Sequence, residues 1–318
     1  MAQTKPRIGI SSCLLGQRVR YDGGHKKDEF LTQTFGRFVE WVAVCPEVEV
    51  GMGTPRESIR LVGSATSPEL VGDRSGRNWT ESMHAYAKRR VSELSTMNLA
   101  GYVLKKDSPS CGMERVRVYP GKGKAPNRNG RGMFAQVLLE ASPLLPIEEE
   151  GRLNDPKLRD NFIERIFAYQ RWNMLLEDRP SVGKLVAFHT AHKFVLMAHS
   201  DPHLRQLGRL VAGAKARPLR EALEAYGCLF MEALRVPATV RKHVNVLTHL
   251  AGYVSKPLSP DERAELAETI VDYHHSLVPL IVPITLIRHY VKKYRMAYIQ
   301  DQVYLQPHPK ELMLRNHV

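Results

Sequence analysis

Three stretches of the sequence decide the fold: RIGISSC at residues 7–13, WVAVCPE at 41–47 and GYVLKKDSPSCG at 101–112. Each is an apolar or β-branched run that stops at a cysteine beside turn or helix-start residues, as the carboxyl end of a parallel strand does. If the three strands are neighbours in one parallel sheet, their cysteines emerge at the same edge. Open α/β sheets bind their ligands at that edge.

The segments between these strands favour the same architecture. Residues 28–38 are predicted to form a short amphipathic helix, and residues 79–97 a longer one with Thr80 near its start. Residues 50–62 are rich in Gly and Pro and are expected to form a loop. The alternation of strand and helix predicts an α/β domain with a mainly parallel sheet.

Residues 116–140 are expected to form a strand edge, a glycine-rich basic loop and a short helix. The loop, residues 121–132, has two interpretations: a solvated connection or an arm that contacts phosphates. Its basic residues are Lys122, Lys124, Arg128 and Arg131.

A domain boundary is predicted near residues 142–155, where Pro, an acidic triplet and Gly interrupt the pattern. The domains are therefore residues 1–150 and 151–318. From there the periodicity is wholly helical, and the second domain is predicted to be all-α. Its helices are expected at about 156–178, 181–199, 203–213, 218–235, 239–254, 260–276 and 280–300.

The protein is expected to be cytoplasmic. With 318 residues, 43% apolar and 25% charged, the sequence is typical of a soluble globular protein. The N-terminus lacks a signal-peptide core, and no apolar run reaches the roughly 18 residues of a membrane helix. Disulfides are therefore not expected. The net charge of +13, spread over both halves, favours a polyanionic partner, nucleic acid first; the alternative is a basic protein without such a partner.

The four cysteines carry the chemical signal. Cys228 lies in a helical, mostly apolar segment and is expected to be a buried structural thiol. None of Cys13, Cys45 and Cys111 belongs to a CxxC motif. Spacing alone therefore does not indicate a metal site, and the three could be unrelated buried cysteines. Their placement at strand ends instead favours a metal centre with one open position. Thiolates select zinc, copper or iron–sulfur clusters.

Polar residues crowd the same strand ends. Glu47 follows Cys45 by two residues, Ser108 and Ser110 precede Cys111, and Ser11 and Ser12 precede Cys13. A carboxylate and a hydroxyl beside an open metal position can activate water and deliver protons. Taken singly, these residues have plainer interpretations, a surface carboxylate and turn caps.

Residues 7–140 resemble the thiouracil desulfidase family. The motifs are SSCLLGxxVRYDGGHK at 11–26, VCPE at 44–47, GTPRES at 53–58 and KKDSPSCG at 105–112. Residues 181–316 resemble the helical domain fused to it, in KLVAFHTAHKFVLMAHS, HVNVLTHLAGY, VPLIVPITLIRHYV and YLQPHPKELMLRN. The two-domain arrangement is similar to bacterial desulfidases that act on 4-thiouridine in tRNA.

The resemblance implies a [4Fe-4S] cluster on Cys13, Cys45 and Cys111 and hydrolysis without net redox change. It implies that Glu47 deprotonates water and that Ser110 or Ser108 relays protons, with the choice between the serines open. Substrate contacts are expected from polar residues in or near these motifs: Ser12, Asp22, Arg56, Lys106 and Arg131.

In the helical domain, His189, His192 and His199 recur along one helix without a metal-binding signature, so helix packing or RNA contact is expected. A basic and aromatic stretch, residues 288–295, is the candidate for RNA contact, or else a solvated helix face with its tyrosines packed inward.

The sequence therefore predicts a tRNA 4-thiouridine desulfidase, with no membrane and no evident protein partner. Two alternatives remain: a desulfidase of free thiouracil or thionucleosides, and a non-enzymatic nucleic-acid-binding protein whose cluster or zinc is structural or sensory.

Overall fold

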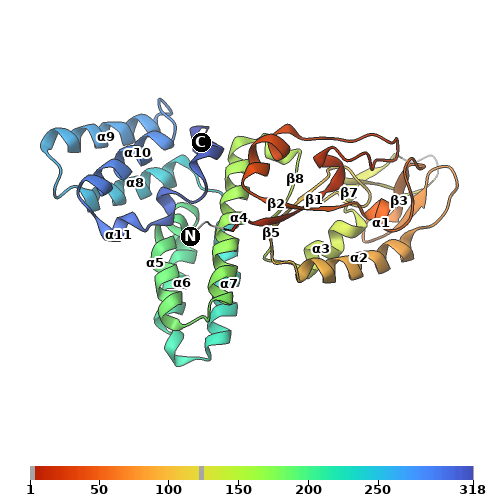
Figure 1. Cartoon of the computed structure of the whole chain (residues 1–318), viewed down its shortest axis with the longest axis horizontal. Coiled ribbons are helices and arrows are strands. Elements are labelled where there is room, and N and C mark those ends of the chain that lie inside the picture. Colours follow the sequence, from red (N-terminus) through yellow and green to blue (C-terminus); the bar gives the residue numbers. More distant parts are fainter. Residues whose placement is uncertain (1–3, 122–124, 318) are drawn as a thin grey trace. The chain divides into compact units, whose positions relative to one another are not determined.

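The structure, a computed structural model, describes residues 4–121 and 125–317 and divides into two compact units, Met1–Asn154 and Asp155–Val318 (Figure 1). The first unit is α/β and the second is helical, which confirms the predicted fold class. In the described ranges, no helix has the length and apolar character needed to cross a membrane. The expectations for Lys122 and Lys124 lie outside the described residues.

The first sheet has four parallel strands in the order β2-β1-β5-β8. The strands are β1 (Arg7–Ser11), β2 (Glu40–Val44), β5 (Leu99–Leu104) and β8 (Ile147–Glu149). All six residues of the central strand β5 are buried, as expected for a parallel sheet that is covered on both faces. The three cysteine-bearing strands are therefore consecutive neighbours, as predicted.

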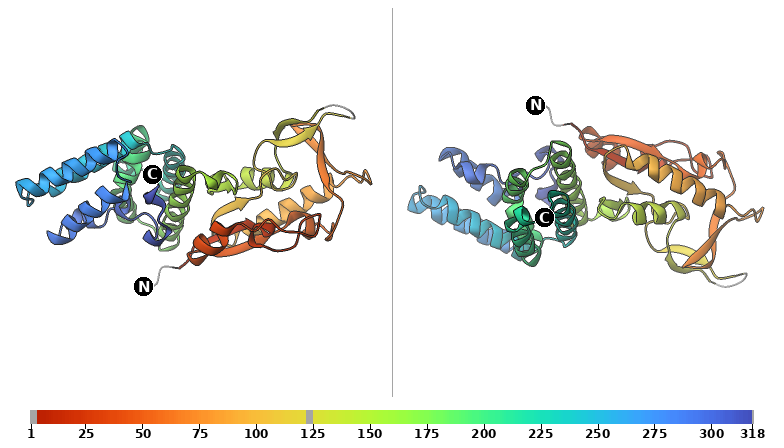
Figure 2. Two further views of the ribbon diagram at one scale, coloured as in Figure 1. Left: turned by 90° about the horizontal axis from the view of Figure 1, so that it is seen from above. Right: turned by 90° about the horizontal axis from the view of Figure 1, so that it is seen from below.

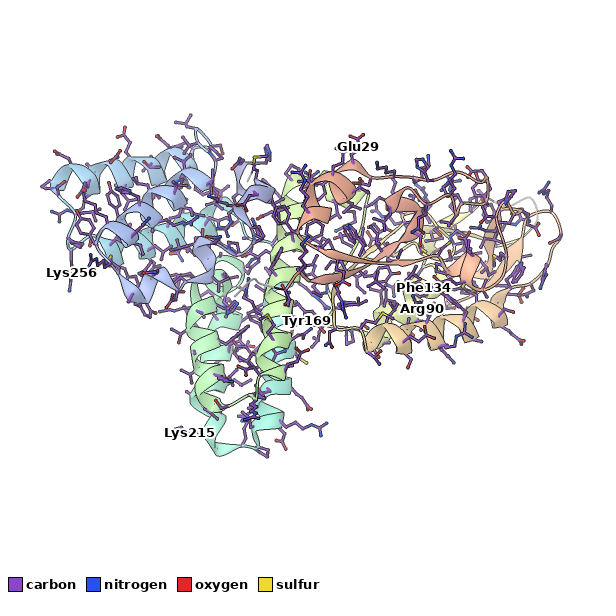
Figure 3. All side chains as sticks on the ribbon, viewed as in Figure 1. Glu29, Arg90, Phe134, Tyr169, Lys215 and Lys256 are labelled. Atoms are coloured by element: carbon purple, nitrogen blue, oxygen red, sulfur yellow. The ribbon has the colours of Figure 1, made fainter. Side chains whose placement is uncertain are left out.

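Two helices cover one face of this sheet side by side (Figure 2). They are α2 (Thr80–Ser95) and α3 (Met133–Ala141). Phe134 of α3, which is labelled in Figure 3, packs on two tyrosine rings. Its ring centroid lies 6.3 Å from that of Tyr86 and 6.0 Å from that of Tyr102. Tyr102 in turn lies so close to β1 that a Cβ on Gly9 would come within 2.1 Å of its ring. A glycine at position 9 is what allows this packing.

A second, mixed sheet has the order β4-β3-β6-β7. Its strands are β3 (Ile59–Ser64), β4 (Ser67–Gly72), β6 (Val116–Tyr119) and β7 (Asn127–Gly130). The predicted loops at 50–62 and 121–132 are therefore wrong in part, because β3 begins inside the first and β7 lies inside the second. In β7, Asn and Gly residues have poor strand propensity and only Gly130 is buried, so the sequence carries little strand signal there.

Two further local expectations need correction. Residues 28–38, predicted to be an amphipathic helix, form one π-helical turn at Phe30–Thr34 and one 3₁₀ turn at Phe35–Arg37. The acidic triplet that was expected to mark the domain boundary instead contributes to the buried strand β8 and its end. The contact boundary lies after Asn154.

The second unit consists of helices whose positions follow the predicted ranges closely. They are α4 (Pro156–Glu177), α5 (Val182–His199), α6 (Asp201–Ala212), α7 (Leu219–Arg235), α8 (Val240–Val254), α9 (Pro260–His274), α10 (Ile281–Lys293) and α11 (Ala297–Gln300). Asp155 caps α4, and Ser259 forms a capping box with Glu262. The single helix predicted at 280–300 is broken, because Arg295 takes a left-handed conformation after α10.

The last segment of the chain packs back onto α4. His308 lies 3.1 Å from the carboxylate of Asp160, and Arg315 lies 3.7 Å from that of Glu164. Arg315 also donates a hydrogen bond of 2.5 Å to the carbonyl of Tyr304. The YLQPHPKELMLRN stretch therefore closes the core of the second unit with buried polar contacts.

Candidate metal centre and catalytic pocket

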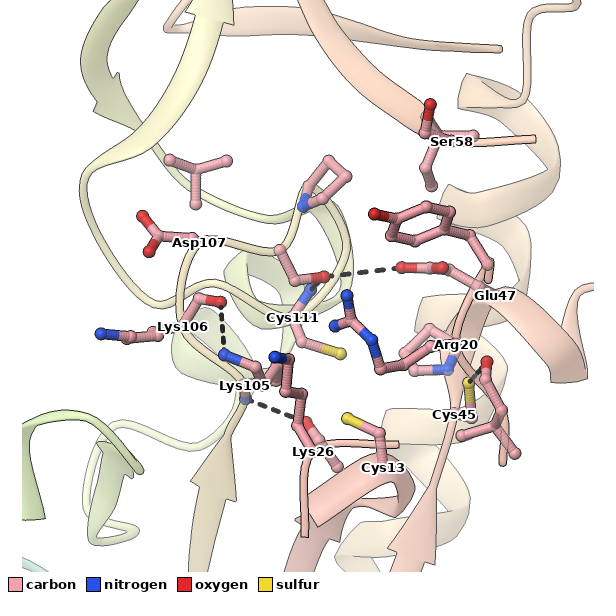
Figure 4. A pocket seen from close by; sticks show the side chains of 18 of the residues that line it. Cys13, Arg20, Lys26, Cys45, Glu47, Ser58, Lys105, Lys106, Asp107 and Cys111 are labelled. Carbon is pink, nitrogen blue, oxygen red and sulfur yellow. Dashed lines mark hydrogen bonds between the residues drawn. The ribbon is translucent and has the colours of Figure 1, made fainter. Parts of the chain in front are cut away.

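Three cysteines line one pocket at the carboxyl edge of the first sheet (Figure 4). Cys13 lies in the 3₁₀ turn after β1, Cys45 precedes helix α1 (Pro46–Glu49) after β2, and Cys111 lies in the loop after β5. The pocket has a volume of about 490 Å³. In Figure 4 the sulfur atoms of Cys13 and Cys111 point toward the same space. The strand order thus brings together three thiols that are far apart in the sequence.

The chemistry of this donor set fits an iron–sulfur core. Burial raises the pKa of the Cys13 thiol to about 11 and also raises the pKa values of Cys45 and Cys111, which repel one another as thiolates. A bound cation is what would favour three thiolates here at neutral pH. Within residues 4–121 and 125–317, no three His, Cys, Asp or Glu side chains are arranged to hold a single metal ion. A cluster of several irons is larger than one metal ion, so its cysteine ligands lie farther apart than those of a single ion.

Glu47 is fixed at both carboxylate oxygens. Its Oε1 accepts a hydrogen bond of 2.6 Å from Ser110 Oγ. Its Oε2 accepts hydrogen bonds from Arg56, one of them from Nε at 3.1 Å. The Glu47 side chain is 15% exposed and lines the pocket, so it combines a fixed orientation with access to a bound molecule.

Arg56, expected to contact substrate, has its guanidinium occupied by the protein. The side chain is 6% exposed. Besides binding Glu47, it donates from Nη1 to the carbonyl oxygens of Val19 at 2.9 Å and Gly53 at 2.8 Å. The Val19 carbonyl also lies 3.8 Å from Cys45 Sγ. Arg56 therefore joins the Glu47 carboxylate to the loop beside Cys45.

The two candidate serines have different environments. Ser110 is fully buried and does not line the pocket, whereas Ser108 is partly exposed and lines it. Their hydroxyl oxygens lie 3.0 Å apart, and Ser108 Oγ accepts hydrogen bonds from the backbone N–H groups of Ser110 and Cys111. Ser108 Oγ lies 3.5 Å from Glu47 Oε1. Of these two serines, only Ser108 is among the residues that line the pocket.

The loop that carries these serines is held by the start of α3. The N–H groups of Met133, Phe134 and Ala135 donate to the carbonyl oxygens of Pro109 and Ser110. A Cβ on Gly132 would lie 2.6 Å from the Ser110 carbonyl group and 2.8 Å from the Cys111 nitrogen. Contacts this short require a glycine.

The buried acidic triplet contacts the loop that bears Cys111. Lys105 forms an ion pair of 2.5 Å with Glu150, whose other oxygen accepts from the Lys106 N–H at 2.8 Å. Glu149 accepts from the Met113 N–H at 2.7 Å, and burial raises its pKa. The triplet thus fixes both ends of the loop that bears Cys111.

The remaining substrate-contact predictions divide into two groups. Ser12 and Lys106 line the pocket. Asp22 is exposed and accepts a hydrogen bond from the Gly24 N–H, and Arg131 donates to the Met113 carbonyl; neither is among the residues that line the pocket.

Sequence reasoning missed five cations that line the pocket: Arg20, Lys26, Arg60, Lys105 and Arg117. The Nε of Arg20 is buried without a hydrogen-bond partner in the described part of the chain and lies 3.5 Å from Asp22 Oδ1. Arg20 and Lys26 belong to the motif at 11–26, and Lys105 to the motif at 105–112. Their basic character beside cysteine ligands was the available signal.

Cys228 contradicts its expected burial, because it is exposed on α7. The apolar run around it suggested a core position, but Tyr226, Gly227 and Phe230 take the buried face and leave Cys228 on the outer one. The apolar residues around Cys228 in the sequence therefore did not show which face of the helix Cys228 occupies.

The histidines predicted for helix packing do pack inside the second unit. Burial lowers the pKa of His192 to about 3, its Nδ1 lies 2.8 Å from the Phe188 carbonyl, and Arg171 donates to its Nε2 at 3.2 Å. His199 contacts the Val236 carbonyl at 2.7 Å.

The candidate RNA-contact stretch at 288–295 is partly occupied by the protein. Tyr290 donates to Glu265, and Tyr294 and Lys293 bind Glu262. Other exposed basic side chains lie on this stretch, at His289, Lys292 and Arg295.

Comparisons with known proteins identify relatives of both halves. Residues 8–150 match the family model described as 2-thiouracil desulfurase, and residues 193–309 match a domain family described as a protein of unknown function, DUF1722. The chain is 33% identical over 165 residues to the uncharacterized protein YbgA of Escherichia coli K12, covering 52% of this chain and 98% of YbgA. It is 31% identical over 153 residues to the uncharacterized protein YbbK of Bacillus subtilis 168, covering 46% of this chain and 98% of YbbK.

A solved structure is also similar. It is titled [4Fe-4S]-dependent thiouracil desulfidase TudS, with 30% identity, a TM-score of 0.39, and coverage of 48% of this chain and 95% of that chain.

Proposed function

Because the chain belongs to the 2-thiouracil desulfurase family through residues 8–150, we propose that it is the desulfidase that converts 4-thiouridine in tRNA to uridine. Family membership makes it an enzyme that removes sulfur from a thiolated pyrimidine. The proposal adds the tRNA substrate, a [4Fe-4S] cluster held by Cys13, Cys45 and Cys111, and action in the cytoplasm.

The observation that carries the catalytic part is the arrangement of Glu47 and Ser108 beside three thiols in one pocket. When bound, the cluster supplies an iron without a protein ligand, a Lewis acid that suits a thiocarbonyl sulfur. The protein's own groups then have to activate water and manage its protons.

Glu47 is the proposed general base. Its carboxylate takes a proton from water, whose oxygen forms the new bond to C4 of the base, and the carbon–sulfur bond breaks. Arg56 and Ser110 keep the carboxylate in place during this step. Ser108 hydrogen-bonds the reacting atoms and relays both water protons to the departing sulfur, the one held by Glu47 and the one left on the new C4 hydroxyl. The sum is thiocarbonyl plus water giving carbonyl plus hydrogen sulfide, with no net redox change.

Other pocket residues are proposed to hold the pyrimidine. Arg20 lines the pocket and pairs through Nε with Asp22 at 3.5 Å, and its guanidinium is proposed to donate to a pyrimidine carbonyl. Ser12 and Lys106 offer further polar contacts at the wall. A base inside folded tRNA has to leave its stack to reach this pocket, as in other base-modifying enzymes.

The tRNA part of the proposal rests on charge and on the fused helical unit. The net charge of +13 favours a polyanion. Exposed His289, Lys292 and Arg295 near the end of α10 are proposed to contribute to tRNA docking. Free 2-thiouracil is the second candidate substrate, because the family description names it.

The deciding experiment measures sulfide release by the anaerobically reconstituted full chain from thiolated tRNA, free 4-thiouridine and free 2-thiouracil. Glu47→Gln serves as the inactive control. We expect release from thiolated tRNA that requires Glu47. Release from a free base or nucleoside alone would contradict the tRNA substrate. Cluster binding without release from any substrate would favour a non-enzymatic nucleic-acid-binding protein.

A further inference from the structure

The second sheet carries three arginines in one row across neighbouring strands. Arg117 of β6 pairs with Arg128 of β7. The β3–β6 pairing of Leu61 with Val118 places Arg60 beside Arg117, one residue earlier on each strand. All three are exposed, while Leu61 and Val118 are buried on the opposite face. The arginine row, Arg60, Arg117 and Arg128, therefore lies on one face of the sheet.

The arginine row begins at the catalytic pocket. Arg60 and Arg117 line the same pocket as the cysteines and Glu47, and so does Tyr119, which follows Arg117 by two residues on the same face. The guanidinium of Arg60 lies 5.3 Å from the centroid of the Tyr119 ring. The pocket wall is thus continuous with a basic surface that includes an aromatic ring.

Charge across the row is only partly balanced by the protein. Arg60 forms an ion pair of 3.2 Å with Asp73, and Arg128 forms one of 3.2 Å with Asp107, in both cases between exposed side chains. Arg117, in the middle, forms no ion pair with any residue of the described ranges. Like charges directly opposite one another on neighbouring strands destabilise a sheet. An anion bound along the row would relieve this repulsion.

We propose that the arginine row binds the phosphates of the RNA strand that flanks the target nucleotide, with Tyr119 as a stacking surface for an adjacent base. The inference rests on the proposed function and locates strand recognition on the catalytic unit itself. Exposed ion pairs with Asp73 and Asp107 are weak, so phosphates can displace them. Arginine suits this role because its planar guanidinium binds phosphate oxygens through two N–H groups at once.

The test compares the wild-type full chain with a triple variant, Arg60→Gln, Arg117→Gln and Arg128→Gln. We measure its dissociation constant for thiolated tRNA over a salt series, and kcat/KM for thiolated tRNA and for free 4-thiouridine. Loss of three phosphate contacts is expected to make the slope of log K against log salt shallower by about 2. We expect the dissociation constant to rise roughly tenfold or more, and the loss in kcat/KM to be larger for tRNA than for the free nucleoside.

A matched control removes the same charge elsewhere on the first unit. Arg7→Gln, Arg37→Gln and Arg89→Gln change three exposed arginines that do not line the pocket. If both triple variants have the same affinity and salt slope, the inference is overturned. An equal loss on tRNA and on free nucleoside also overturns it, because the row would then serve the pocket alone. Failure of the proposed function is separate, since it appears in the wild type as absence of sulfide release from tRNA.

Folding of the variant is checked by its melting temperature. Removing arginines from a repulsive row is expected to leave Tm unchanged or to raise it at low ionic strength. If the triple variant melts early, the single Arg117→Gln variant, which breaks no ion pair in the described ranges, replaces it. Its expected change in salt slope is about 0.7, and an unchanged slope overturns the proposal.

Discussion

Arg56 Nε donates to Glu47 Oε2 at 3.1 Å from a side chain that is only 6% exposed. This pairing makes Arg56 a positioning residue for the carboxylate. Arg56→Met is expected to lower kcat by about 100-fold while KM changes little, because the base loses its orientation and substrate binding does not. Steady-state kinetics on free 4-thiouridine checks this, and Arg56→Lys should recover part of kcat. A change in KM alone would contradict the positioning role and indicate that Arg56 binds substrate.

Replacing each of the two serines by alanine is expected to have different effects on kcat and on stability. Ser108→Ala removes the hydroxyl of the serine that lines the pocket, so we expect kcat to fall about 100-fold or more. Ser110→Ala removes the 2.6 Å hydrogen bond to the charged Glu47 carboxylate, so we expect a loss of about 1–3 kcal/mol in the free energy of unfolding and a smaller effect on kcat. Urea unfolding and kinetics of both variants decide, and the reverse pattern would contradict the assignment.

Iron binding is expected to depend on three of the four cysteines. Changing Cys13, Cys45 or Cys111 singly to serine should abolish the visible absorption of the anaerobically reconstituted protein and lower its iron content from about four per chain. Cys228→Ser is the matched control and should retain both, because Cys228 is exposed outside the pocket. A Cys45→Ser protein with unchanged iron and absorption would contradict the ligand set.

Gly132→Ala is expected to disrupt the cluster site without touching a ligand. The new Cβ would lie 2.6 Å from the Ser110 carbonyl group, so the loop that bears Cys111 has to shift. We expect weaker iron retention on treatment with a chelator. Gly252→Ala is the control: its Cβ meets nothing within 4 Å on helix α8, so it should stabilise the protein by about 0.5–1 kcal/mol. Equal iron retention in both variants would disprove the close-approach argument.

The helical unit is expected to lose stability as the pH falls. Burial lowers the folded-state pKa of His192 to about 3, below its unfolded value of about 6.5, so the unfolded chain binds the extra proton between these values. Stability is therefore fully present above about pH 6.5 and falls by up to ~1.4 kcal/mol per pH unit toward pH 3 from this residue. Urea unfolding followed by Trp172 fluorescence at pH 7, 6 and 5 measures the slope.

His192→Gln is the variant that tests this pH dependence. It should reduce the slope by about one proton, because glutamine does not titrate. His275→Gln, at the exposed end of α9, is its control and should keep the wild-type slope. A wild-type slope in the His192 variant would contradict the assignment.

The first sheet could be predicted from the sequence because its strands are continuous apolar runs that end in polar residues. The helices of the second unit could be predicted because caps such as Asp155 and Ser259 mark their starts. Of the second sheet, only β6 was predicted, as the strand edge at the start of residues 116–140. The other strands could not be, since β7 buries only Gly130 and β3 ends in exposed Gly63 and Ser64. The strands of this sheet are fixed by pairing with one another, which a local pattern does not show.

In the site, the three cysteines lie together because they follow neighbouring parallel strands. The sequence was sufficient to predict this grouping, since each of these strands is an apolar run that ends near a cysteine. The roles of Arg56 and Ser110 were not accessible, because both depend on which side of Glu47 each side chain occupies. Glu150 was missed for another reason: an acidic run ordinarily predicts a solvated surface, and burial beside Lys105 is a property of the folded chain.

The position of β8 decides where the gene can be divided. A recombinant fragment that stops before Ile147 would leave β5 as a bare outer strand and remove the carboxylate partner of Lys105. In such a fragment, β5 would be an edge strand whose outer side is unpaired and can pair with other chains, and the Cys111 loop would lack an anchoring contact. The fragment would therefore aggregate more readily than the intact chain. A fragment that expresses the first unit alone therefore has to extend to Asn154, past the glutamates at 148–150 where the sequence suggests a domain boundary.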